Sequence, residues 1–143
     1  MKNKKLVKEW LQRAKSNLKI AIDGKISDEV FYEDLCFNAQ QAIEKALKAL
    51  FILYDVSIPK THNIGFLLES LEKYTDIELT KNIKQSVILT EYAVQSRYPG
   101  SYYPVEYDDY MEAIQIASEV LDWVYIIVNF RFTENDWRYN IGY

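Results

Sequence analysis

The chain has 143 residues, of which 49% are hydrophobic and 27% charged, and its formal net charge at pH 7 is -4. These values are typical of one soluble globular domain with a substantial core. Four glycines and three prolines are too few for a disordered or linker-rich chain. The small negative charge indicates no general preference for nucleic acid or for an anionic membrane.

We expect a cytoplasmic protein. The single cysteine, Cys36, has no disulfide partner in the chain and is expected to be a small buried residue in a reducing compartment. No apolar run approaches the roughly 18 residues that a membrane span needs, and the lysine-rich start lacks the apolar core of a signal peptide. No membrane association is therefore expected.

A first amphipathic helix is predicted over Lys4–Asp23, with Gly24 ending it. Its inner stripe consists of apolar residues three and four positions apart: Val7, Leu11, Ala14, Leu18 and Ala21. Lys8, Lys15 and Lys19 share one flank of this helix. That flank is expected to be a solvated face or to meet the acidic closing helix; a guide for RNA is the alternative.

The stretch Asp28–Tyr54 predicts a long central helix around which the other helices pack, with Ser27 or Asp28 as its cap. Its apolar residues recur at helical steps: Leu35, Ala39, Ala42, Ile43, Ala46, Leu50 and Leu53. Its polar residues are expected on the solvent side: Asn38, Gln40, Gln41, Glu44, Lys45 and Lys48. Within this set, Glu44 and Lys48 are spaced as a helical ion pair.

Three further helices are predicted. Asn63 is expected to cap a short third helix that ends in the polar run 73–76, a fourth spans about Glu78–Ser96, and a fifth runs over about Glu106–Phe132. No strand-like alternation of useful length occurs. The predicted fold class is therefore all-α, an antiparallel bundle of four to five helices over residues 1–132, followed by a C-terminal tail over residues 133–143.

The fifth helix carries two apolar surfaces. Its broad inner face consists of Tyr110, Ala113, Ala117, Val120, Leu121, Val124 and Val128. A second apolar ridge lies beside an acidic face and consists of Ile116, Trp123, Ile127 and Phe130. A bare ridge of this kind is expected to meet another chain, unless the first helix covers it.

The sequence offers little for metal or cofactor chemistry. Its one histidine and one cysteine lie far apart, whereas a metal centre needs several ligands that face one another. The chain contains no glycine-rich phosphate loop, no GxSxG and no HExxH. We therefore expect no metal site and no cofactor.

Lys60, Thr61 and His62 form the first candidate binding cluster, at the start of the third helix. A helix N-terminus offers N–H groups and positive potential, which suit a phosphate. The alternative is a structural role, in which Thr61 or Asn63 caps the helix while His62 bonds a neighbouring loop.

The second candidate cluster lies in the turn after the fourth helix. Arg97 is followed by Tyr98, Tyr102 and Tyr103, within a segment that two prolines and a glycine keep out of a helix. A guanidinium beside aromatic rings can hold a phosphate and stack a base. The alternative is that Arg97 caps the fourth helix and the tyrosines only pack.

The order of several short motifs resembles the HEPN domain family of prokaryotic helical-bundle proteins. A basic first helix precedes Ala39–Ala49 (AQQAIEKALKA), then Thr61–Ile64 (THNI), then Arg97–Gly100 (RYPG), and finally a long closing helix. The resemblance covers about residues 5–130, and the ordered combination is more specific than any one motif. It implies a bundle of four or five helices, usually a homodimer, often encoded beside a small nucleotidyltransferase as a toxin–antitoxin-like pair.

Nuclease members of that family carry an arginine followed by a histidine after roughly four to six intervening residues, and these residues of both subunits cut RNA without metal. In such a pair the imidazole moves a proton and the guanidinium holds the scissile phosphate. Arg97 matches the arginine, but Tyr102, Tyr103 and Pro104 stand where the histidine is expected. A phenol, with a pKa of about 10, is a poor proton shuttle at neutral pH.

The leading hypothesis is therefore a dimeric HEPN module that binds a nucleotide, an RNA phosphate or a nucleotidyltransferase partner in a toxin–antitoxin-like system, without an intact nuclease motif. The sequence leaves enzymatic activity open, although the missing histidine argues against it. The first alternative is a metal-independent ribonuclease that uses Arg97 as a catalytic residue. The second alternative is a purely structural dimerisation or interaction protein.

Overall fold

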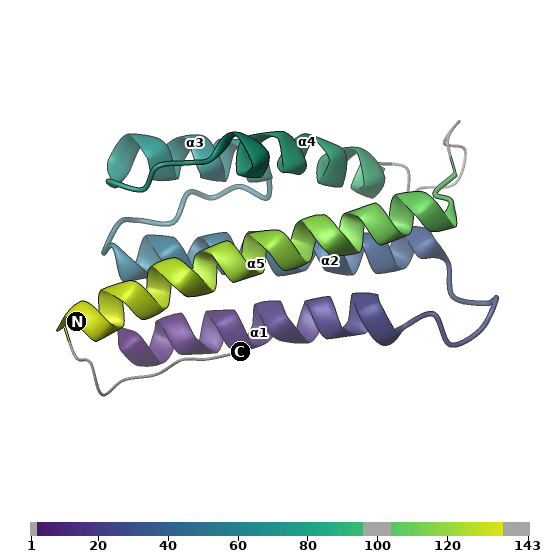
Figure 1. Ribbon diagram of the computed structural model, residues 1–143, viewed down its shortest axis with the longest axis horizontal. Coiled ribbons are helices and arrows are strands. Elements are labelled where there is room, and N and C mark those ends of the chain that lie inside the picture. Colours follow the sequence, from purple (N-terminus) through teal and green to yellow (C-terminus); the bar gives the residue numbers. More distant parts are fainter. Residues whose placement is uncertain (1–2, 96–103, 136–143) are drawn as a thin grey trace.

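The computed structural model describes residues 3–95 and 104–135. Within these ranges the chain forms five helices and no strand: α1 (Lys4–Asp23), α2 (Tyr32–Leu53), α3 (Ile64–Tyr74), α4 (Lys81–Gln95) and α5 (Tyr107–Asn135) (Figure 1). The all-α prediction is confirmed. The predicted site residues Arg97, Tyr98, Tyr102 and Tyr103 lie outside the described residues.

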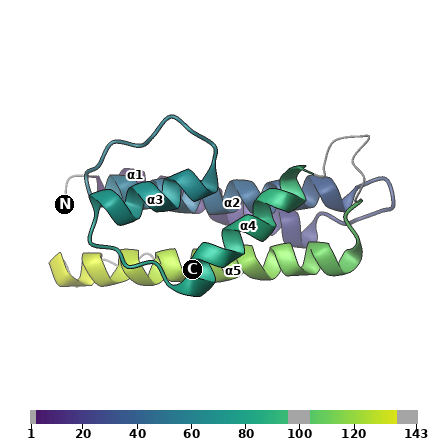
Figure 2. The same cartoon turned by 90° about the horizontal axis from the view of Figure 1, so that it is seen from above.

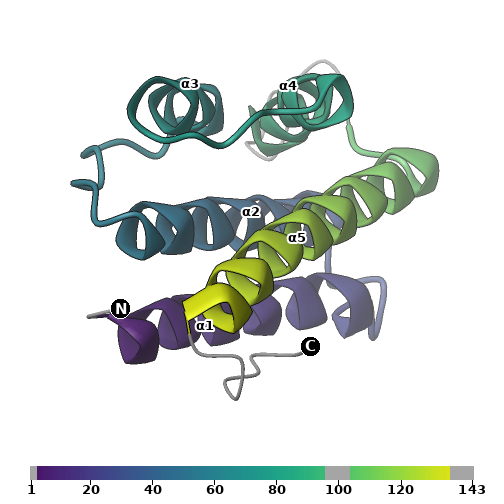
Figure 3. The same ribbon diagram turned by 60° about the vertical axis from the view of Figure 1, so that its left-hand side comes forward.

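Helix α2 is the centre of the bundle, as the sequence predicts. It contacts each of the other four helices, and its contact with α1 is the most extensive in the described structure. α3 and α4 cover one side of α2, α1 covers the opposite side, and α5 crosses α2 obliquely (Figures 1 and 3). Because α2 is enclosed from several directions, most of its surface belongs to the core.

The inner stripes predicted for α1 and α5 are confirmed. All five predicted residues of α1 are buried, and so are all seven predicted for α5. Most of them join the stripe of α2 in a core that also includes Ile64, Leu67 and Leu71 of α3. Tyr110 and Ala113 of α5 lie in a second, smaller cluster with Leu35 and Cys36 of α2. Helical spacing of apolar residues is a strong signal when one side of a helix faces the core.

Two predictions for α2 are wrong. The helix begins at Tyr32 rather than Asp28, and Phe31 occupies the N-cap position without a side-chain cap. The polar face of α2 is also less exposed than predicted, because Gln40 and Glu44 are 5% and 3% exposed. The layer formed by α3 and α4 covers α2 on a side that the sequence pattern assigns to solvent.

Helix α3 runs in the same direction as the C-terminal half of α2. At the start of α3, His62 bonds Glu44 of α2, and beyond its end Asp76 lies near Tyr54, which follows α2. The connection from Tyr54 to Asn63 therefore passes back along α2 before α3 begins (Figures 1 and 2). This crossover places the start of α3 beside the middle of α2.

Helices α4 and α5 start slightly later than predicted. Thr80 precedes α4, and its Oγ1 accepts a hydrogen bond from the Ile83 N–H at 3.2 Å, which identifies Thr80 as the cap. Before α5, the Glu106 N–H donates to Asp109 Oδ2 at 3.0 Å. The first contact satisfies a backbone N–H in the first turn of α4. The second contact joins the Glu106 N–H to a carboxylate in the first turn of α5.

Helix α5 qualifies as a membrane span over Tyr107–Phe132 by length and composition alone. This finding contradicts the expectation that no apolar run approaches that length. The inner face of α5 is nevertheless buried against α1, α2 and α4. The apolar character of α5 therefore matches its place as a core helix of the bundle.

Candidate functional site

The segment Lys60–Asn63 joins the crossover to α3, and part of its predicted structural role is confirmed. Asn63 caps α3, because its Oδ1 accepts a hydrogen bond from the Phe66 N–H at 2.9 Å. Thr61 Oγ1 in turn accepts from the Asn63 N–H at 3.0 Å. The two side chains fix the backbone immediately around His62.

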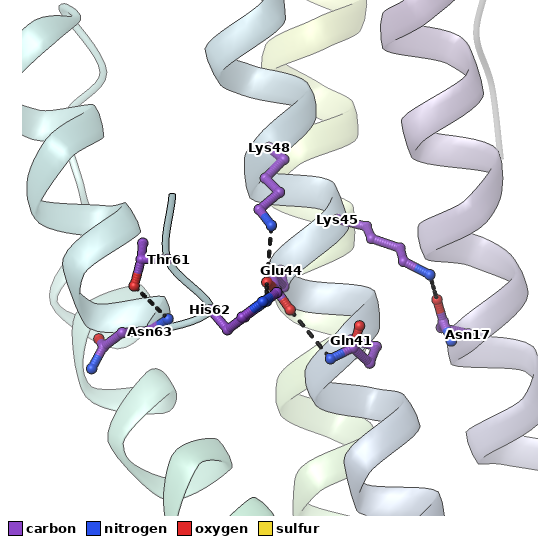
Figure 4. A network of polar contacts seen from close by, with 8 residues as sticks. All are labelled: Asn17, Gln41, Glu44, Lys45, Lys48, Thr61, His62 and Asn63. Carbon is purple, nitrogen blue, oxygen red and sulfur yellow. Dashed lines mark hydrogen bonds and ion pairs between the residues drawn. The ribbon is translucent and has the colours of Figure 1, made fainter. Parts of the chain in front are cut away.

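His62 contacts the central helix rather than a neighbouring loop, which corrects the structural alternative considered for it. Its Nδ1 lies 2.6 Å from Oε1 of Glu44. Figure 4 shows the imidazole reaching from the crossover to the middle of α2. The histidine side chain is 87% exposed, whereas the glutamate side chain is 3% exposed.

Glu44 is the hub of a polar network. Besides His62, its Oε1 pairs with Lys48 Nζ at 3.0 Å, which confirms the predicted helical pair, and its Oε2 accepts from Gln41 Nε2 at 3.2 Å (Figure 4). A carboxylate that leaves water needs such partners, since an unpaired buried charge is costly. The network thus fixes the carboxylate in a single position behind the imidazole.

A second polar chain lies on the side of α2 that faces α1. Lys45 Nζ donates to Asn17 Oδ1 at 2.7 Å, and Asn17 Nδ2 donates to Asn38 Oδ1 at 3.0 Å. Figure 4 places this contact away from Glu44, on the opposite flank of α2. It ties α1 to α2 and has no contact with the His62 site among the interactions of the described residues.

The His62 site presents one imidazole nitrogen outward. Because Nδ1 is engaged by a carboxylate, the natural arrangement is Nδ1–H donating to Glu44 while Nε2 is open to an incoming group. Lys60 is exposed two residues earlier, and the N-terminus of α3 begins two residues later. These features favour an anionic ligand at the segment that carries His62.

The structure therefore brings Lys60, Thr61 and His62 together with residues that the sequence pattern does not place in the site. The pattern predicts Glu44, Lys48 and Gln41 on the solvent side of α2. The spacing of Glu44 and Lys48 predicts that they pair, but nothing in the sequence predicts that His62 also bonds Glu44. His62 lies 18 positions from Glu44 in sequence, and only the crossover brings them together.

A second feature is a groove between α5, the end of α2 and the α3–α4 connection. Its volume is about 470 Å³, and its lining includes Ile77, Trp123, Ile126, Ile127 and Phe130. Ile126 and Phe130 are 69% and 67% exposed. The predicted ridge is thus confirmed in part: Trp123 and Ile127 are half-buried against the core, while Ile116 is buried and Ile126 takes its place.

One end of this groove is polar. The guanidinium carbon of Arg131 lies 4.0 Å from the ring centroid of Tyr54, close enough for a cation–π contact. Burial raises the pKa of Tyr54, and a hydrogen bond with Asp76 raises it further, while the nearby Arg131 charge acts in the opposite direction. The three side chains join the end of α5 to the end of α2.

Cys36 is not part of either site. It is fully buried, as predicted, and burial together with the carboxylates Glu33 and Asp109 raises the pKa of its thiol to about 12. A thiol in that state is neither a nucleophile nor a metal ligand at neutral pH. Among the described residues, no group of three or more His, Cys, Asp or Glu side chains could hold a metal ion.

Comparisons with known proteins agree with this fold. The chain matches the family model of the HEPN domain over residues 7–127. It is similar to the crystal structure of ST0689, an archaeal HEPN homologue, with a TM-score of 0.66 and 30% sequence identity over 85% of this chain and 97% of that one. It is also similar to TT1696 from Thermus thermophilus, with a TM-score of 0.69 and 25% identity over 82% of this chain and 94% of that one.

None of the curated proteins matches the chain. The family model nevertheless spans most of the sequence, including the central helix, the crossover and most of α5. The chain therefore belongs to the HEPN domain family.

Proposed function

We propose that this HEPN protein is a binding module for phosphate groups of a nucleotide or of RNA, with Lys60, Thr61 and His62 as its described contact residues. The observation that carries the proposal is the exposed imidazole held from behind by buried Glu44. A protonated imidazole in this position donates to Glu44 through Nδ1 and to a phosphate oxygen through Nε2. Lys60 adds an exposed positive charge beside it.

Arg97, Tyr98, Tyr102 and Tyr103 are proposed as the second part of the binding surface, since a guanidinium with aromatic rings suits a nucleotide. The lack of a histidine after Arg97 favours binding without cleavage. We propose a small nucleotidyltransferase of a toxin–antitoxin-like pair as the protein partner, and the cytoplasm as the location.

Isothermal titration calorimetry with ATP, GTP and short RNAs tests ligand binding. We expect His62→Ala, Lys60→Ala and Arg97→Ala each to weaken binding about tenfold, the size of one lost charge-assisted hydrogen bond. Lys81→Ala is the matched control, because Lys81 is an exposed lysine at the start of another helix. Absence of heat from every ligand, or equal binding by all the variants, would reject the proposal.

The ribonuclease alternative is tested separately by incubating labelled RNA with the protein in EDTA. The exposed lysines of α1 at positions 8, 15 and 19 motivate it, because they could guide RNA. We expect no cleavage. Cleavage that disappears in Arg97→Ala would replace the binding module with a metal-independent nuclease.

A second candidate role is self-association through the α5 ridge, here defined as Trp123, Ile126, Ile127 and Phe130. The stretch from Trp123 to Phe130 contains no charged residue, so the ridge is compatible with the same surface of a second copy. We propose a homodimer across this ridge, with the two exposed residues Ile126 and Phe130 at its centre.

Sedimentation velocity of Ile126→Glu tests this interface better than a change at Trp123, which also packs against the core. We expect a dimer for the native sequence and a folded monomer for Ile126→Glu. Met111→Glu is the control, since Met111 is an exposed apolar residue of the same helix outside the groove. A native monomer, or an Ile126→Glu dimer, would exclude the ridge as the interface.

A further inference from the structure

The geometry around His62 controls which of its ring nitrogens can react. Nδ1 lies 2.6 Å from the Glu44 carboxylate, and the side chain is 87% exposed, so Nε2 is the nitrogen that an incoming molecule meets. With the proton held on Nδ1, the lone pair of neutral imidazole lies on Nε2. His62 is thus presented as an oriented nucleophile.

The carboxylate behind the ring stabilises the product of a nucleophilic attack. When Nε2 forms a new bond, positive charge develops on the ring, and a fixed carboxylate at Nδ1 stabilises that charge. Glu44 is suited to this role because Lys48 and Gln41 hold both of its oxygens while only 3% of its side chain is exposed. A mobile surface glutamate would be screened by water.

The charges of the segment that carries His62 favour an electrophile that carries negative charge. Lys60 is exposed in the same segment, and α3, an 11-residue helix, begins two residues after His62. The partial positive charge of a helix N-terminus stabilises phosphoryl oxygens. The predicted phosphate preference of this segment and the orientation of its histidine are therefore both consistent with transfer of a phosphoryl group to His62.

We propose that His62 is a phosphoryl-acceptor residue that becomes phosphorylated on Nε2. The Nε2 lone pair forms a nitrogen–phosphorus bond, the bond between phosphorus and the leaving group of the donor breaks, and the Nδ1 proton stays in the hydrogen bond to Glu44. The donor is a nucleoside triphosphate held by a separate enzyme, and the corresponding diphosphate leaves. No oxidation or reduction takes place.

The exposure of His62 favours an acceptor over a catalytic base. A general base acts on a substrate that a pocket holds against it, whereas most of this side chain projects into solvent. A projecting side chain can enter the active site of another enzyme. The inference concerns a residue of the proposed binding surface but does not require that this chain bind a nucleotide or RNA by itself.

Potassium phosphoramidate, a small phosphoryl donor, tests the reactivity of His62 directly. In its zwitterionic form, attack by Nε2 breaks the phosphorus–nitrogen bond and releases ammonia. His62 is the only histidine in the chain, so every phosphohistidine formed is assigned to it. Phosphorus NMR distinguishes Nε2 from Nδ1 products, and intact mass measures the rate.

We expect one phosphoryl group per chain, on Nε2, at a rate about tenfold above that of N-acetylhistidine at the same pH, because a positioned carboxylate assists the imidazole. Glu44→Gln removes the carboxylate charge and should bring the rate down to that of N-acetylhistidine. Glu72→Gln is the control, since Glu72 forms an exposed surface pair with Lys84. Circular dichroism establishes that the variants are folded.

Three results would overturn the proposal: a native rate equal to that of N-acetylhistidine, a product on Nδ1, or an unchanged rate in folded Glu44→Gln. If Glu44→Gln does not fold, the comparison of the native chain with N-acetylhistidine still decides. Calorimetric binding without phosphorylation would reject the acceptor and keep the binding module. Phosphorylation without calorimetric binding would keep the acceptor and reject the binding module.

Discussion

The Nδ1 atom of His62 and the Oε1 atom of Glu44 are 2.6 Å apart, yet the two side chains lie in very different environments. The carboxylate is 3% exposed and has two further partners on α2, whereas the imidazole is 87% exposed. Such a contact orients the exposed imidazole, whereas the buried carboxylate would keep two partners on α2 without it. The two residues should therefore contribute unequally to stability.

Glu44→Ala is expected to lower the free energy of unfolding by roughly 2–4 kcal/mol, because it leaves Lys48, whose side chain is 14% exposed, without its carboxylate. His62→Ala should lower it by about 1 kcal/mol or less, because Lys48 and Gln41 still satisfy the carboxylate. Urea unfolding measures both. Equal losses would mean that the imidazole, and not the α2 network, stabilises the buried carboxylate.

A double-mutant cycle on the same pair gives the interaction energy without the other contacts of Glu44. We expect a coupling of about 0.5–1.5 kcal/mol between His62 and Glu44. The surface pair of Glu72 and Lys84, whose side chains are 46% and 50% exposed, is the control cycle. Its coupling should be about 0.5 kcal/mol or less.

Gly24→Ala is expected to destabilise the protein by about 1–3 kcal/mol, the usual cost of overpacking. A Cβ at this position would lie 2.5 Å from the Ile20 carbonyl oxygen and 2.5 Å from Leu35 Cδ2. The backbone oxygen cannot move away without distorting the end of α1. Gln12→Ala, on the exposed side of α1, is the control and should change stability by less than about 0.5 kcal/mol.

The contrast between α1 and α2 explains which parts of the fold the sequence predicts. α1 has one buried stripe and an exposed remainder, so helical spacing identifies its core residues correctly. α2 is covered on several sides, and hydrophobicity alone cannot show that Gln40 and Glu44 become buried once α3 and α4 pack over them. A buried polar residue needs hydrogen-bond partners, and Glu44 has Lys48 and Gln41 on its own helix and His62 from the crossover.

The same reasoning applies to the candidate site. Lys60, Thr61 and His62 are adjacent in sequence, so their proximity and the capping role of Asn63 are predictable. The carboxylate that orients His62 comes from another helix by way of the crossover, and no local pattern indicates it. For α5, the spacing predicts a ridge, but the oblique crossing over α2 decides that Ile116 is buried and Ile126 is exposed.

The pKa of Cys36 predicts a loss of stability at alkaline pH. The unfolded thiol ionises near its ordinary pKa of 9.0, whereas burial keeps the folded thiol protonated up to about 12. Above pH 9.0 the unfolded state binds fewer protons than the folded state, so stability falls as pH rises. The contribution of the thiol is complete below pH 9.0 and is lost between that value and about 12.

Urea unfolding of the native chain and of Cys36→Ala on both sides of pH 9.0 tests this dependence. The stability of Cys36→Ala should fall less steeply with rising pH. Burial also raises the pKa values of Tyr54 and Tyr125, and these residues are present in both proteins. The pKa of Tyr110 is raised by burial and then by the neighbouring Cys36, so the difference between the two curves reports the thiol together with its effect on Tyr110. If the stabilities of the two proteins fall in parallel as pH rises, the pH dependence does not come from the Cys36 thiol.

Asp55 is expected to be a site where a glycine improves stability. It follows α2 with a φ of 57°, in the left-handed region, and the Val56 N–H donates to the Phe51 carbonyl at 2.9 Å as in a Schellman motif. The carboxylate also lies at the negative end of the helix dipole. Asp55→Gly removes both penalties and should raise the free energy of unfolding by about 0.5–1 kcal/mol, after the greater chain entropy of glycine in the unfolded state.

Asp55→Asn separates the two causes, because asparagine keeps a side chain that tolerates the left-handed region but carries no charge. If the dipole dominates, Asp55→Asn should recover most of the gain of Asp55→Gly in urea unfolding, and the gain should shrink in high salt. If the backbone conformation dominates, only Asp55→Gly should be more stable, at any salt concentration. A loss of stability in Asp55→Gly would mean that the Asp55 side chain makes a favourable contribution greater than the combined cost of its backbone conformation and its charge.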